Sequence, residues 1–442
     1  MAGIRTQAAT RELFGWAMFD FANSSYTTVI ITVVYSVIFP RIIVGDAPTF
    51  PYGNFLWSVA LAVSNCVVLL CAPVLGAVMD YSAAKKRFLL VSTAITVLAT
   101  AALFCVRPGD VWLGIALIVC SNIGFMLGES FIASFLPALG PPERLGAISG
   151  YAWGMGYFGG LASTAIVLFG LGALEAENFS NLRYVGPITA VFFAIAAIPT
   201  FIWLREPGVP RTLPGIAAYA RVGFQRLRAT LGALGDFRDL AVLLLSYLFA
   251  YAGLSVVISF AFIYGDQVVR WSPMVQMSMF IVTQVTAACG ALAFGHIQDR
   301  AGPKPAYAAT LLLWITAVVL IFFVDDITAA ANRLGGEWQV QHLFLVIGSV
   351  AGLGLGATQS SCRAMVGVLS PLSKSGEFFG LWGMANRLAA VCGLMALGFL
   401  QAAFGLRNAF LICIAFFAAA LAIGLMVNVD RGRAAARSHE GE

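Results

Sequence analysis

The chain has 442 residues, of which 60% are hydrophobic and only 11% are charged. A soluble domain carries about 25% charged residues, so this composition excludes a soluble globular protein and indicates an integral membrane protein. The net charge of +5 fits the charge asymmetry that orients a membrane protein, and we expect no nucleic-acid partner.

Long apolar segments run through the whole chain. A helix that spans a membrane needs about 20 mostly apolar residues. Runs this long and continuous are not the strands of a membrane barrel, so the sequence predicts an all-α integral membrane protein. Twelve segments are candidate transmembrane helices: 12–40, 54–79, 88–106, 111–137, 145–171, 184–204, 239–265, 273–298, 305–324, 341–367, 376–402 and 407–429.

The basic residues indicate how these helices are oriented. If both termini are placed in the cytoplasm, eighteen Lys and Arg residues fall on the cytoplasmic side and six on the outer side. Cytoplasmic loops of membrane proteins carry an excess of Lys and Arg. We therefore expect both termini in the cytoplasm.

The first apolar segment carries a polar stripe. Asn23, Ser24 and Thr27 follow Asp20 at three, four and seven positions, so all four share one helix face. A groove filled by water or substrate would explain the stripe. Asp20, Asn23, Ser24 and the neighbouring Tyr26 are then candidate substrate-binding residues, and Asp20 is a candidate for proton coupling. Alternatively, Asp20 lies near the inner helix end and only caps or anchors the helix.

A short motif follows the second segment and recurs after the eighth. A glycine in such a motif lets two helices approach closely. An aspartate just past a helix end can accept hydrogen bonds from the N-terminus of a neighbouring helix. We interpret both copies as gating loops. Three residues recur with equal spacing, namely Gly76, Asp80 and Lys85 in the first copy and Gly295, Asp299 and Lys304 in the second. The second copy also contains Arg300, which we include in its gating motif.

Glu129 lies deep in the fourth segment, on the face of Asn122 and near Ser130. Apolar surroundings favour the neutral acid unless a cation pairs with it. Two roles remain open. Glu129 binds and releases a proton during transport, or it is the structural partner of an arginine.

The longest polar break covers residues 205–238. Its apolar residues fall at helical spacing with arginines around them, which predicts an amphipathic helix on the inner leaflet. A disordered linker is the alternative. This linker would separate an N-terminal six-helix bundle, 1–204, from a C-terminal one, 239–430, with a cytoplasmic tail at 431–442.

The two halves share more than the loop motif. Trp153-Gly154-Met155 and Trp382-Gly383-Met384 follow Gly128 and Gly356 at nearly equal distances. Halves related in this way fit the parallel repeats of transporters whose substrate site lies at mid-membrane. The aromatic residues Trp153, Tyr157 and Trp382 are candidates to line that site, although ordinary helix packing would also explain them.

Two arginines lie within apolar segments of the second half. A charge at this depth costs at least about 2.5–3.5 kcal/mol, so it usually faces a cavity or a partner. Arg363 shares a face with Gln359 and could pair with Glu377. Arg387, which follows Asn386, either balances an acid on the first or fourth helix or binds an anionic group of the substrate. Gln359, Arg363, Asn386 and Arg387 are therefore candidate substrate-binding residues.

Nothing in the sequence indicates a catalyst or a metal site. The eight cysteines lie in apolar segments without metal-ligand spacing, so we interpret them as small helix-packing residues. No hydrolase, metalloprotease or nucleotide-binding motif is present. We expect no enzymatic activity, no metal and no cofactor.

Several of these stretches resemble a known family. G-x-x-x-D-R-x-G-x-K at 295–304 resembles the signature loop of the major facilitator superfamily, from which the first copy departs at Tyr81 and Ala83. Within that superfamily, the sequence resembles the vacuolar amino-acid effluxer-like family. The stretches that carry this resemblance are W-A-M-F-D-F-A-N-S-S-Y at 16–26, A-W-G-M-G-Y-F-G-G at 152–160, Q-S-S-C-R at 359–363 and G-E-F-F-G-L at 376–381.

The resemblance implies twelve helices in two six-helix bundles, secondary transport and, for eukaryotic members, export of amino acids from the vacuole. Asn386-Arg387 stands where a lysine-bearing stretch is expected, and Glu129 stands where many drug–proton antiporters carry arginine. A typical proton-antiport mechanism therefore cannot simply be carried over.

The sequence thus predicts a monomeric secondary transporter for a small polar or zwitterionic solute, such as an amino acid or short peptide. Acids at 20 and 129 and bases at 363 and 387 would complement the two ends of a zwitterion. Export is favoured, and a carboxylate in an apolar setting can couple protons. An uptake carrier or drug exporter is the alternative, and a receptor, assembly factor or lipid scramblase is the alternative from another class.

Overall fold

The fold is entirely helical within the residues that the structure describes. This structure is a computed structural model, and it describes residues 8–46, 50–208, 215–232 and 235–440. In these ranges eleven helical stretches are long and apolar enough to cross a membrane, and a bent pair of shorter helices can supply a twelfth. The eleven are Thr10–Val44, Pro51–Ser82, Lys85–Cys105, Val111–Ala138, Pro142–Leu171, Ala176–Trp203, Arg238–Val269, Pro273–Ala301, Pro303–Phe322, Val340–Leu369 and Leu372–Ala409.

The predicted twelfth helix is shorter than expected. The backbone leaves the helical region at Gly405 inside α15 (Ser375–Ala409), between the segments predicted at 376–402 and 407–429, and α16 covers only Ile412–Gly424. The next helix, α17 (Val429–Ser438), is bent from α16 by 63°. Part of the predicted C-terminal tail is therefore helical.

The first helix is irregular beyond its midpoint. Helix α1 (Thr10–Ser25) continues into π-helical turns at Tyr26–Val33, a short α2 (Tyr35–Ile38) and further π-helical turns at Phe39–Val44. The segment predicted at 12–40 lies within the single span Thr10–Val44, but the second half of that span is not a regular α-helix. Turns of this kind are rare and frequently occur at functional sites, and here they begin at the candidate residue Tyr26.

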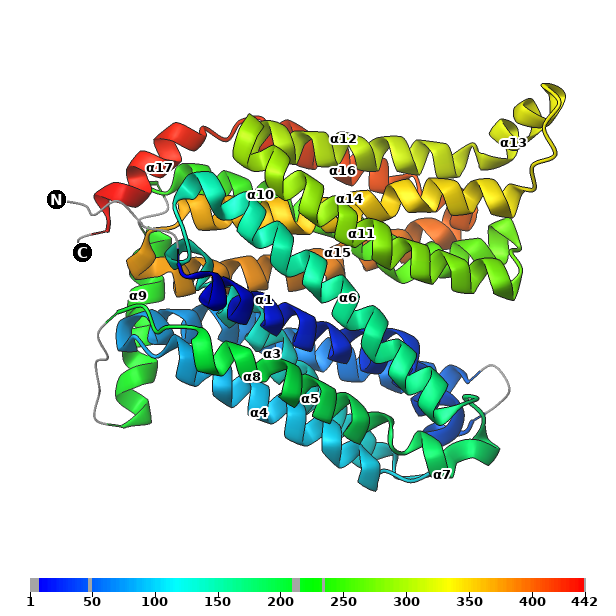
Figure 1. The fold of residues 1–442 in the computed structure, drawn as a ribbon, viewed down its shortest axis with the longest axis horizontal. Coiled ribbons are helices and arrows are strands. Elements are labelled where there is room, and N and C mark those ends of the chain that lie inside the picture. Colours follow the sequence, from blue (N-terminus) through cyan, green and yellow to red (C-terminus); the bar gives the residue numbers. More distant parts are fainter. Residues whose placement is uncertain (1–7, 47–49, 209–214, 233–234, 441–442) are drawn as a thin grey trace. The chain divides into compact units, whose positions relative to one another are not determined.

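The chain forms two compact units. The first consists of Met1–Gly140, Met155–Ala229 and Leu372–Met384. Its long helices are α1, α3 (Pro51–Ser82), α4 (Lys85–Ala102), α5 (Val111–Ala133) and α8 (Val185–Trp203). Figure 1 shows them running side by side, with α1 against α8 and α4 against α5. Trp16 of α1 donates to the carbonyl of Ile132 at 2.8 Å, and Thr200 of α8 to that of Gly15 at 2.7 Å.

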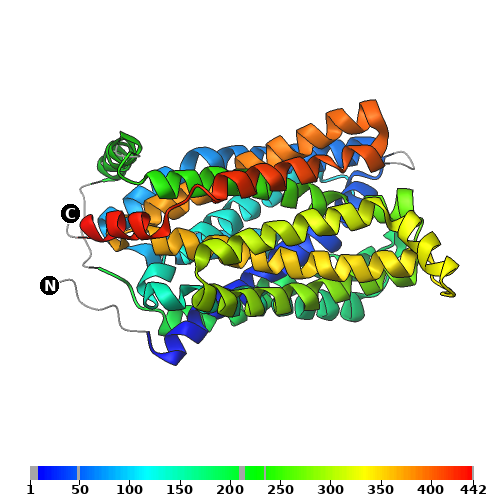
Figure 2. The ribbon, with the colours of Figure 1, turned by 90° about the horizontal axis from the view of Figure 1, so that it is seen from above.

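The second unit consists of Pro141–Gly154, Thr230–Pro371 and Ala385–Glu442. Helix α14 (Val340–Leu369) packs against α11 (Pro273–Ala301) and α12 (Pro303–Phe322), and these helices run side by side in Figures 1 and 2. The core of the second unit includes Trp314, which stacks on Phe417 and donates a hydrogen bond to the hydroxyl of Thr358 at 3.1 Å. This unit also holds α10 (Arg238–Tyr264), α13 (Val324–Arg333), α16 and α17.

Two helices belong to both units. The first residues of α6 (Leu145–Leu171) lie in the second unit and its remainder in the first. The first residues of α15 lie in the first unit and its remainder in the second. These two helix starts are where the two copies of the repeated motif make their contacts.

The linker contains the helix that its pattern predicted. Helix α9 covers Ile216–Gly232 and belongs, up to Ala229, to the first unit. Gly223 lies against α3, because a Cβ there would lie only 2.7 Å from a methyl group of Val78. Leu234, which also fits the predicted pattern, lies outside the described residues.

The interpretation of the cysteines as packing residues is wrong for most of them. Only Cys362 and Cys413 are buried, whereas Cys66, Cys105, Cys120, Cys289 and Cys392 are exposed. Apolar sequence places a side chain in a membrane helix but does not specify which face of the helix it occupies. All eight thiols are free.

Candidate functional site

The first copy of the motif joins α3 to the start of α15. Asp80 Oδ2 accepts a hydrogen bond from the backbone N–H of Glu377 at 2.9 Å. Gly76, one turn earlier, permits the contact because a Cβ at this position would overlap the carbonyl oxygen of Gly376. Asp80 therefore caps the N-terminus of α15, where a negative charge is favourable. It lies in the last turn of α3 and not past the helix end as expected.

Lys85 is part of the same cluster rather than a surface charge. Its Nζ lies 3.1 Å from Asp80 Oδ1, and the two side chains are only 4% and 1% exposed. The ammonium also donates to the carbonyl of Ser134 at 3.3 Å and to the hydroxyl of Ser375. A buried charge needs such partners, because water no longer solvates it.

Two further charged residues complete this cluster. Glu377, which is buried, accepts a 2.6 Å charged hydrogen bond from Arg226 of α9. Arg226 also donates to the carbonyl of Ser373 at 3.4 Å. The cluster thus contains two acids and two bases from α3, α4, α9 and α15. We call Asp80, Lys85, Arg226 and Glu377 the Asp80 cluster.

The start of α4 has a capping residue that the sequence did not reveal. Glu206 accepts hydrogen bonds from the backbone N–H groups of Lys85 and Lys86 at 2.9 and 2.7 Å. Partial burial raises the pKa of Glu206, while these N–H groups and the two lysine charges act in the opposite direction. Glu206 therefore fixes the turn between α3 and α4 on which the Asp80 cluster depends.

The second copy of the motif joins α11 to the start of α6. Asp299 accepts hydrogen bonds from the backbone N–H groups of Gly146 and Ala147 at 2.9 and 3.0 Å. Gly295 permits this approach, since a Cβ there would lie 2.6 Å from the carbonyl oxygen of Gly146. Asp299 therefore caps α6 as Asp80 caps α15, and it too lies within its own helix, in the last turn of α11.

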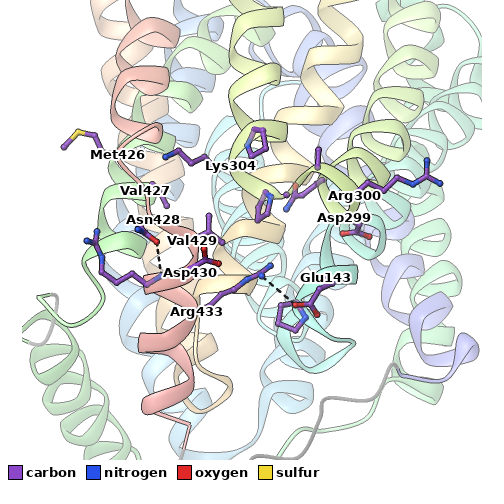
Figure 3. Close-up of a pocket in the computed structure, with 17 residues that line it drawn as sticks. Glu143, Asp299, Arg300, Lys304, Met426, Val427, Asn428, Val429, Asp430 and Arg433 are labelled. Atoms are coloured by element: carbon purple, nitrogen blue, oxygen red, sulfur yellow. Dashed lines mark hydrogen bonds and ion pairs between the residues drawn. The ribbon is translucent and has the colours of Figure 1, made fainter.

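The basic residues of the second copy have a different environment. Arg300 is exposed and Lys304 is half-buried, and within the described ranges neither forms an ion pair. Both line a pocket of about 730 Å³, as do Gln298, Glu143 and Arg433. Figure 3 shows Arg433 of α17 reaching Glu143, at 3.7 Å.

Helix α17 is fixed to the second unit by a second ion pair. Asp239 of α10 accepts two hydrogen bonds from Arg431 at 2.7 and 2.8 Å and one from the backbone N–H of Asn428 at 2.7 Å. The Asp239 side chain is only 3% exposed, whereas that of Arg431 is 54% exposed, so solvent reaches the pair from the arginine side. The pairing could not be recognised in the sequence, because both residues lie at segment ends where isolated charges are common.

The polar stripe of α1 is only partly exposed. Asn23 is buried and its Oδ1 has no hydrogen-bond partner among the described residues, while Asp20 and Ser24 are half-buried. Tyr26 is buried and its hydroxyl lies 2.8 Å from that of Ser121 on α5. Gly156 of α6 packs closely against Ser24. Within its own unit, the stripe therefore meets α6 at Ser24, and the neighbouring Tyr26 meets α5.

The other candidates of the first unit lie on α5, α6 and α15. Glu129 of α5 and Tyr157 of α6 are half-buried, and Trp382 of α15 is buried. Next to Glu129, Ser130 lies so close to Gly383 that a Cβ on that glycine would overlap its hydroxyl. Helices α5 and α15 therefore touch beside Glu129.

Arg363 is the most firmly positioned charge of the second unit. It is 2% exposed, and its guanidinium donates to the hydroxyl and to the carbonyl of Ser149 on α6, both at 3.0 Å. The same guanidinium lies 5.2 Å from the ring centre of Trp153, which is half-buried. The sequence did not indicate Ser149 as a partner.

The remaining candidates of the second unit differ in burial. Gln359 and Asn386 are buried and Arg387 is half-buried. The buried polar atoms without a hydrogen-bond partner within the described ranges include Ser360 Oγ and Ser361 Oγ of α14 and Asn386 Oδ1 of α15. Unpaired polar atoms in a membrane helix are costly unless a polar molecule meets them.

Comparison with known proteins identifies the family. A family model described as "Vacuole effluxer Atg22 like" matches residues 55–437, which is most of the chain. The chain belongs to this family. The resemblance that the sequence motifs indicated is therefore confirmed, and the protein is a transporter of the major facilitator type that acts in a membrane on a small molecule.

Two relatives illustrate the range of this effluxer family. The chain is 24% identical over 392 residues to an uncharacterized MFS-type transporter, YxiO, of Bacillus subtilis, and the alignment covers 87% of each chain. It is 23% identical over 298 residues to autophagy-related protein 22-1 of Penicillium rubens. That alignment covers 65% of this chain and 50% of the fungal protein, so this chain spans about half the length of that relative.

A solved structure supports the fold assignment. The human organic anion transporter MFSD10 matches with a TM-score of 0.71 at 17% identity, covering 94% of this chain and 99% of that one. At this identity the likeness establishes the fold alone. The major facilitator fold predicted from the sequence is therefore confirmed.

Proposed function

We propose that this member of the effluxer family is a secondary transporter that exports a small polar or zwitterionic solute by alternating access. The observation that carries the proposal is the pair of capping aspartates. Asp80 and Asp299 each hold the N-terminus of one helix, α15 and α6, and each does so through a glycine that allows backbone contact. Hydrogen bonds at helix ends can break and re-form without unfolding the helices, as a switching element requires.

The charges of the spanning helices favour a solute with both signs of charge. Asp20 and Glu129 supply acids, and Arg363 and Arg387 supply bases, in helices that otherwise avoid charge. An amino acid or short peptide has the matching pair of groups. The fungal relatives' membership of a vacuole effluxer family supports export, and the half-buried Glu129 is the proposed site of proton coupling.

A purely anionic solute is the second candidate. Arg363 favours it, because a buried arginine with fixed orientation can bind a carboxylate through two parallel hydrogen bonds. An uptake carrier of the same fold would use the same groups. We further propose that the protein is a monomer in a bacterial inner membrane with both termini in the cytoplasm, which the distribution of Lys and Arg supports.

Transport by the purified chain in proteoliposomes tests the solute class. Labelled amino acids, short peptides and dicarboxylates should be compared with and without a pH gradient. Before this assay, a thermal-shift screen can select solutes, since a bound ligand raises apparent stability. Transport of dicarboxylates in the absence of any transport of amino acids or peptides would replace the first candidate by the second.

Separate measurements of binding and transport test the alternating-access mechanism. Asp80→Ala and Asp299→Ala should slow transport yet retain solute binding, because these residues hold helix ends and do not contact the solute. Asp326→Ala, at an exposed position of α13, is the matched control and should behave as the wild type. Loss of binding in a well-folded Asp80→Ala or Asp299→Ala protein would refute the gating role.

A further inference from the structure

The first unit contains a pocket that transport of a polar solute does not explain. An apolar pocket of about 860 Å³ lies beside α9, at the end of α3 and the start of α4. Such a volume falls within the range of ligand-binding pockets. Most of its lining is hydrophobic, and the apolar residues include Val74, Leu75, Val78, Phe88, Phe201 and Tyr219.

One unpaired arginine lines this pocket, and a second follows a lining residue on α9. Arg87 lines the pocket and is exposed, and its guanidinium forms no ion pair or hydrogen bond within the described part of the chain. Arg221 directly follows the lining residue Ala220, and it is likewise exposed and unpaired there. The acid at the pocket, Glu206, is engaged by backbone N–H groups of α4. The unengaged charge at the pocket is therefore positive.

The pocket is also continuous with the surface that faces lipid. Leu90, which lines the pocket, is 52% exposed on a membrane-spanning helix, and Phe224 on α9 is 63% exposed. A polar solute would find few hydrogen-bonding groups in this lining. A molecule with an apolar chain and an anionic group would match both the lining and the arginines.

We propose that this pocket binds a phospholipid with an anionic head group from the surrounding bilayer. One acyl chain lies against α3, α4 and α8 under α9, and the phosphate lies between Arg87 and Arg221. Basic residues at a membrane surface attract anionic lipids, with about 1 kcal/mol per Lys or Arg, which corresponds to roughly a fivefold change in affinity. The site is separate from the charged residues of the spanning helices.

Occupancy of this site would act on the Asp80 cluster through α9. Gly223, one turn after Tyr219, lies directly against α3, so α9 has little freedom to move inward. Arg226 lies further along the same helix and forms an ion pair with Glu377. The backbone N–H of Glu377 in turn donates a hydrogen bond to Asp80. A lipid that fixes α9 therefore favours the Arg226–Glu377 ion pair and with it the capped start of α15. This consequence for transport rests on the proposed function, whereas the binding site itself does not.

Native mass spectrometry of the purified full chain tests the binding site. Dioleoyl phosphatidylglycerol and dioleoyl phosphatidylcholine, which have the same acyl chains, should be titrated separately. We expect tighter binding of phosphatidylglycerol, and roughly fivefold weaker binding for each of Arg87→Gln and Arg221→Gln. A double variant with Arg270→Gln and Arg333→Gln removes the same charge from the second unit and should bind as the wild type.

A pocket-filling variant tests the acyl-chain position. Leu75→Trp occupies the pocket and leaves both arginines in place, so it should weaken binding of phosphatidylglycerol at least fivefold. Unchanged thermal unfolding in lipid-free detergent would show that each variant is folded. Equal affinity for the two lipids, or wild-type affinity of the Arg87→Gln/Arg221→Gln double variant, would overturn the anionic site. Wild-type affinity of Leu75→Trp would overturn the acyl pocket.

Discussion

At the scale of single residues, two aspartates make the same backbone contact with different neighbours. Asp80 caps α15 and also forms an ion pair with Lys85, and both side chains are nearly inaccessible to water. Asp299 caps α6 through two N–H groups, and Lys304 forms no ion pair with it. Removing the negative charge of Asp80 should therefore lower the free energy of unfolding by a different amount than removing that of Asp299.

We predict that Asp80→Asn destabilises the protein more than Asp299→Asn. Asparagine keeps one acceptor at both positions, but at residue 80 it leaves the Lys85 ammonium buried without a counter-charge. Breaking a buried pair costs about 3–5 kcal/mol, whereas weakening the Asp299 cap costs about 1.5 kcal/mol. The free energy of unfolding in detergent, measured for both variants and for Asp326→Asn as a control, checks this. Equal losses would show that Lys85 is not an important partner.

A second prediction at this scale concerns proton coupling. If Glu129 carries the coupled proton, Glu129→Gln should retain solute exchange and lose accumulation driven by a pH gradient, because glutamine cannot release a proton. Proteoliposome transport with and without a pH gradient is the measurement. Gradient-driven transport at the wild-type level in this variant would exclude Glu129 as the proton carrier.

Arg387 provides the corresponding test of solute binding. If it holds an anionic group of the solute, Arg387→Ala should lose binding and Arg387→Lys should retain a weakened form, since lysine keeps the charge without the planar fork of donors. Solute affinity of the two variants is the readout. Wild-type affinity in Arg387→Ala would remove this residue from the site.

At the scale of elements, close helix contacts depend on glycine. The backbones of α3 and α15 touch at Gly76 and Gly376. In the same way, the backbones of α11 and α6 touch at Gly295 and Gly146. In each contact a helix start is held by an aspartate one turn away. A substitution that breaks the glycine contact should therefore also break the aspartate cap of the neighbouring helix.

We predict that Gly76→Ala displaces the start of α15. The added methyl group would overlap the carbonyl of Gly376, and such overpacking costs about 1–3 kcal/mol. The expected signs are a lower unfolding temperature and faster thiol labelling of a cysteine placed at Ser375, which is buried in the intact cluster.

The matched control for this variant lies on α15 itself. Gly398 is within the helix and has open space around its Cβ position. Gly398→Ala should leave the unfolding temperature unchanged or raise it, since alanine favours a helix by about 1 kcal/mol over glycine. If Gly76→Ala and Gly398→Ala change the unfolding temperature equally, tight packing at Gly76 is not the cause of the change.

At the scale of the whole molecule, the orientation in the membrane is the main prediction. The distribution of Lys and Arg places the helix ends at Tyr81 and Arg300 on the cytoplasmic side. In a cysteine-free background, Tyr81→Cys and Arg300→Cys should resist a membrane-impermeant thiol reagent in intact cells and react after permeabilisation. A cysteine at Arg107, expected on the outer side, should react in both cases. Labelling of either loop residue in intact cells would reverse the topology.

The sequence by itself determined the fold class, the family and nearly all of the spanning segments. Hydropathy is a local property, because every span must bring about 20 apolar residues of its own. The capping aspartates were also recognisable, since Gly76 and Asp80 recur as Gly295 and Asp299 with equal spacing. The irregular second half of the first span was not recognisable, because π-helical turns use the same apolar residues as a regular helix.

Only the tertiary structure decided which charges are partners. Arg226 in the linker pairs with Glu377, and Ser149 holds Arg363, across separations of 151 and 214 residues. Lys85 was predicted as part of the gating motif, but its burial against Asp80 is visible only in the structure. Burial and pairing depend on which helix faces pack together, and hydropathy averaged along one helix does not contain that information. Charge pairing is therefore a property of the packed helices and not of any one segment.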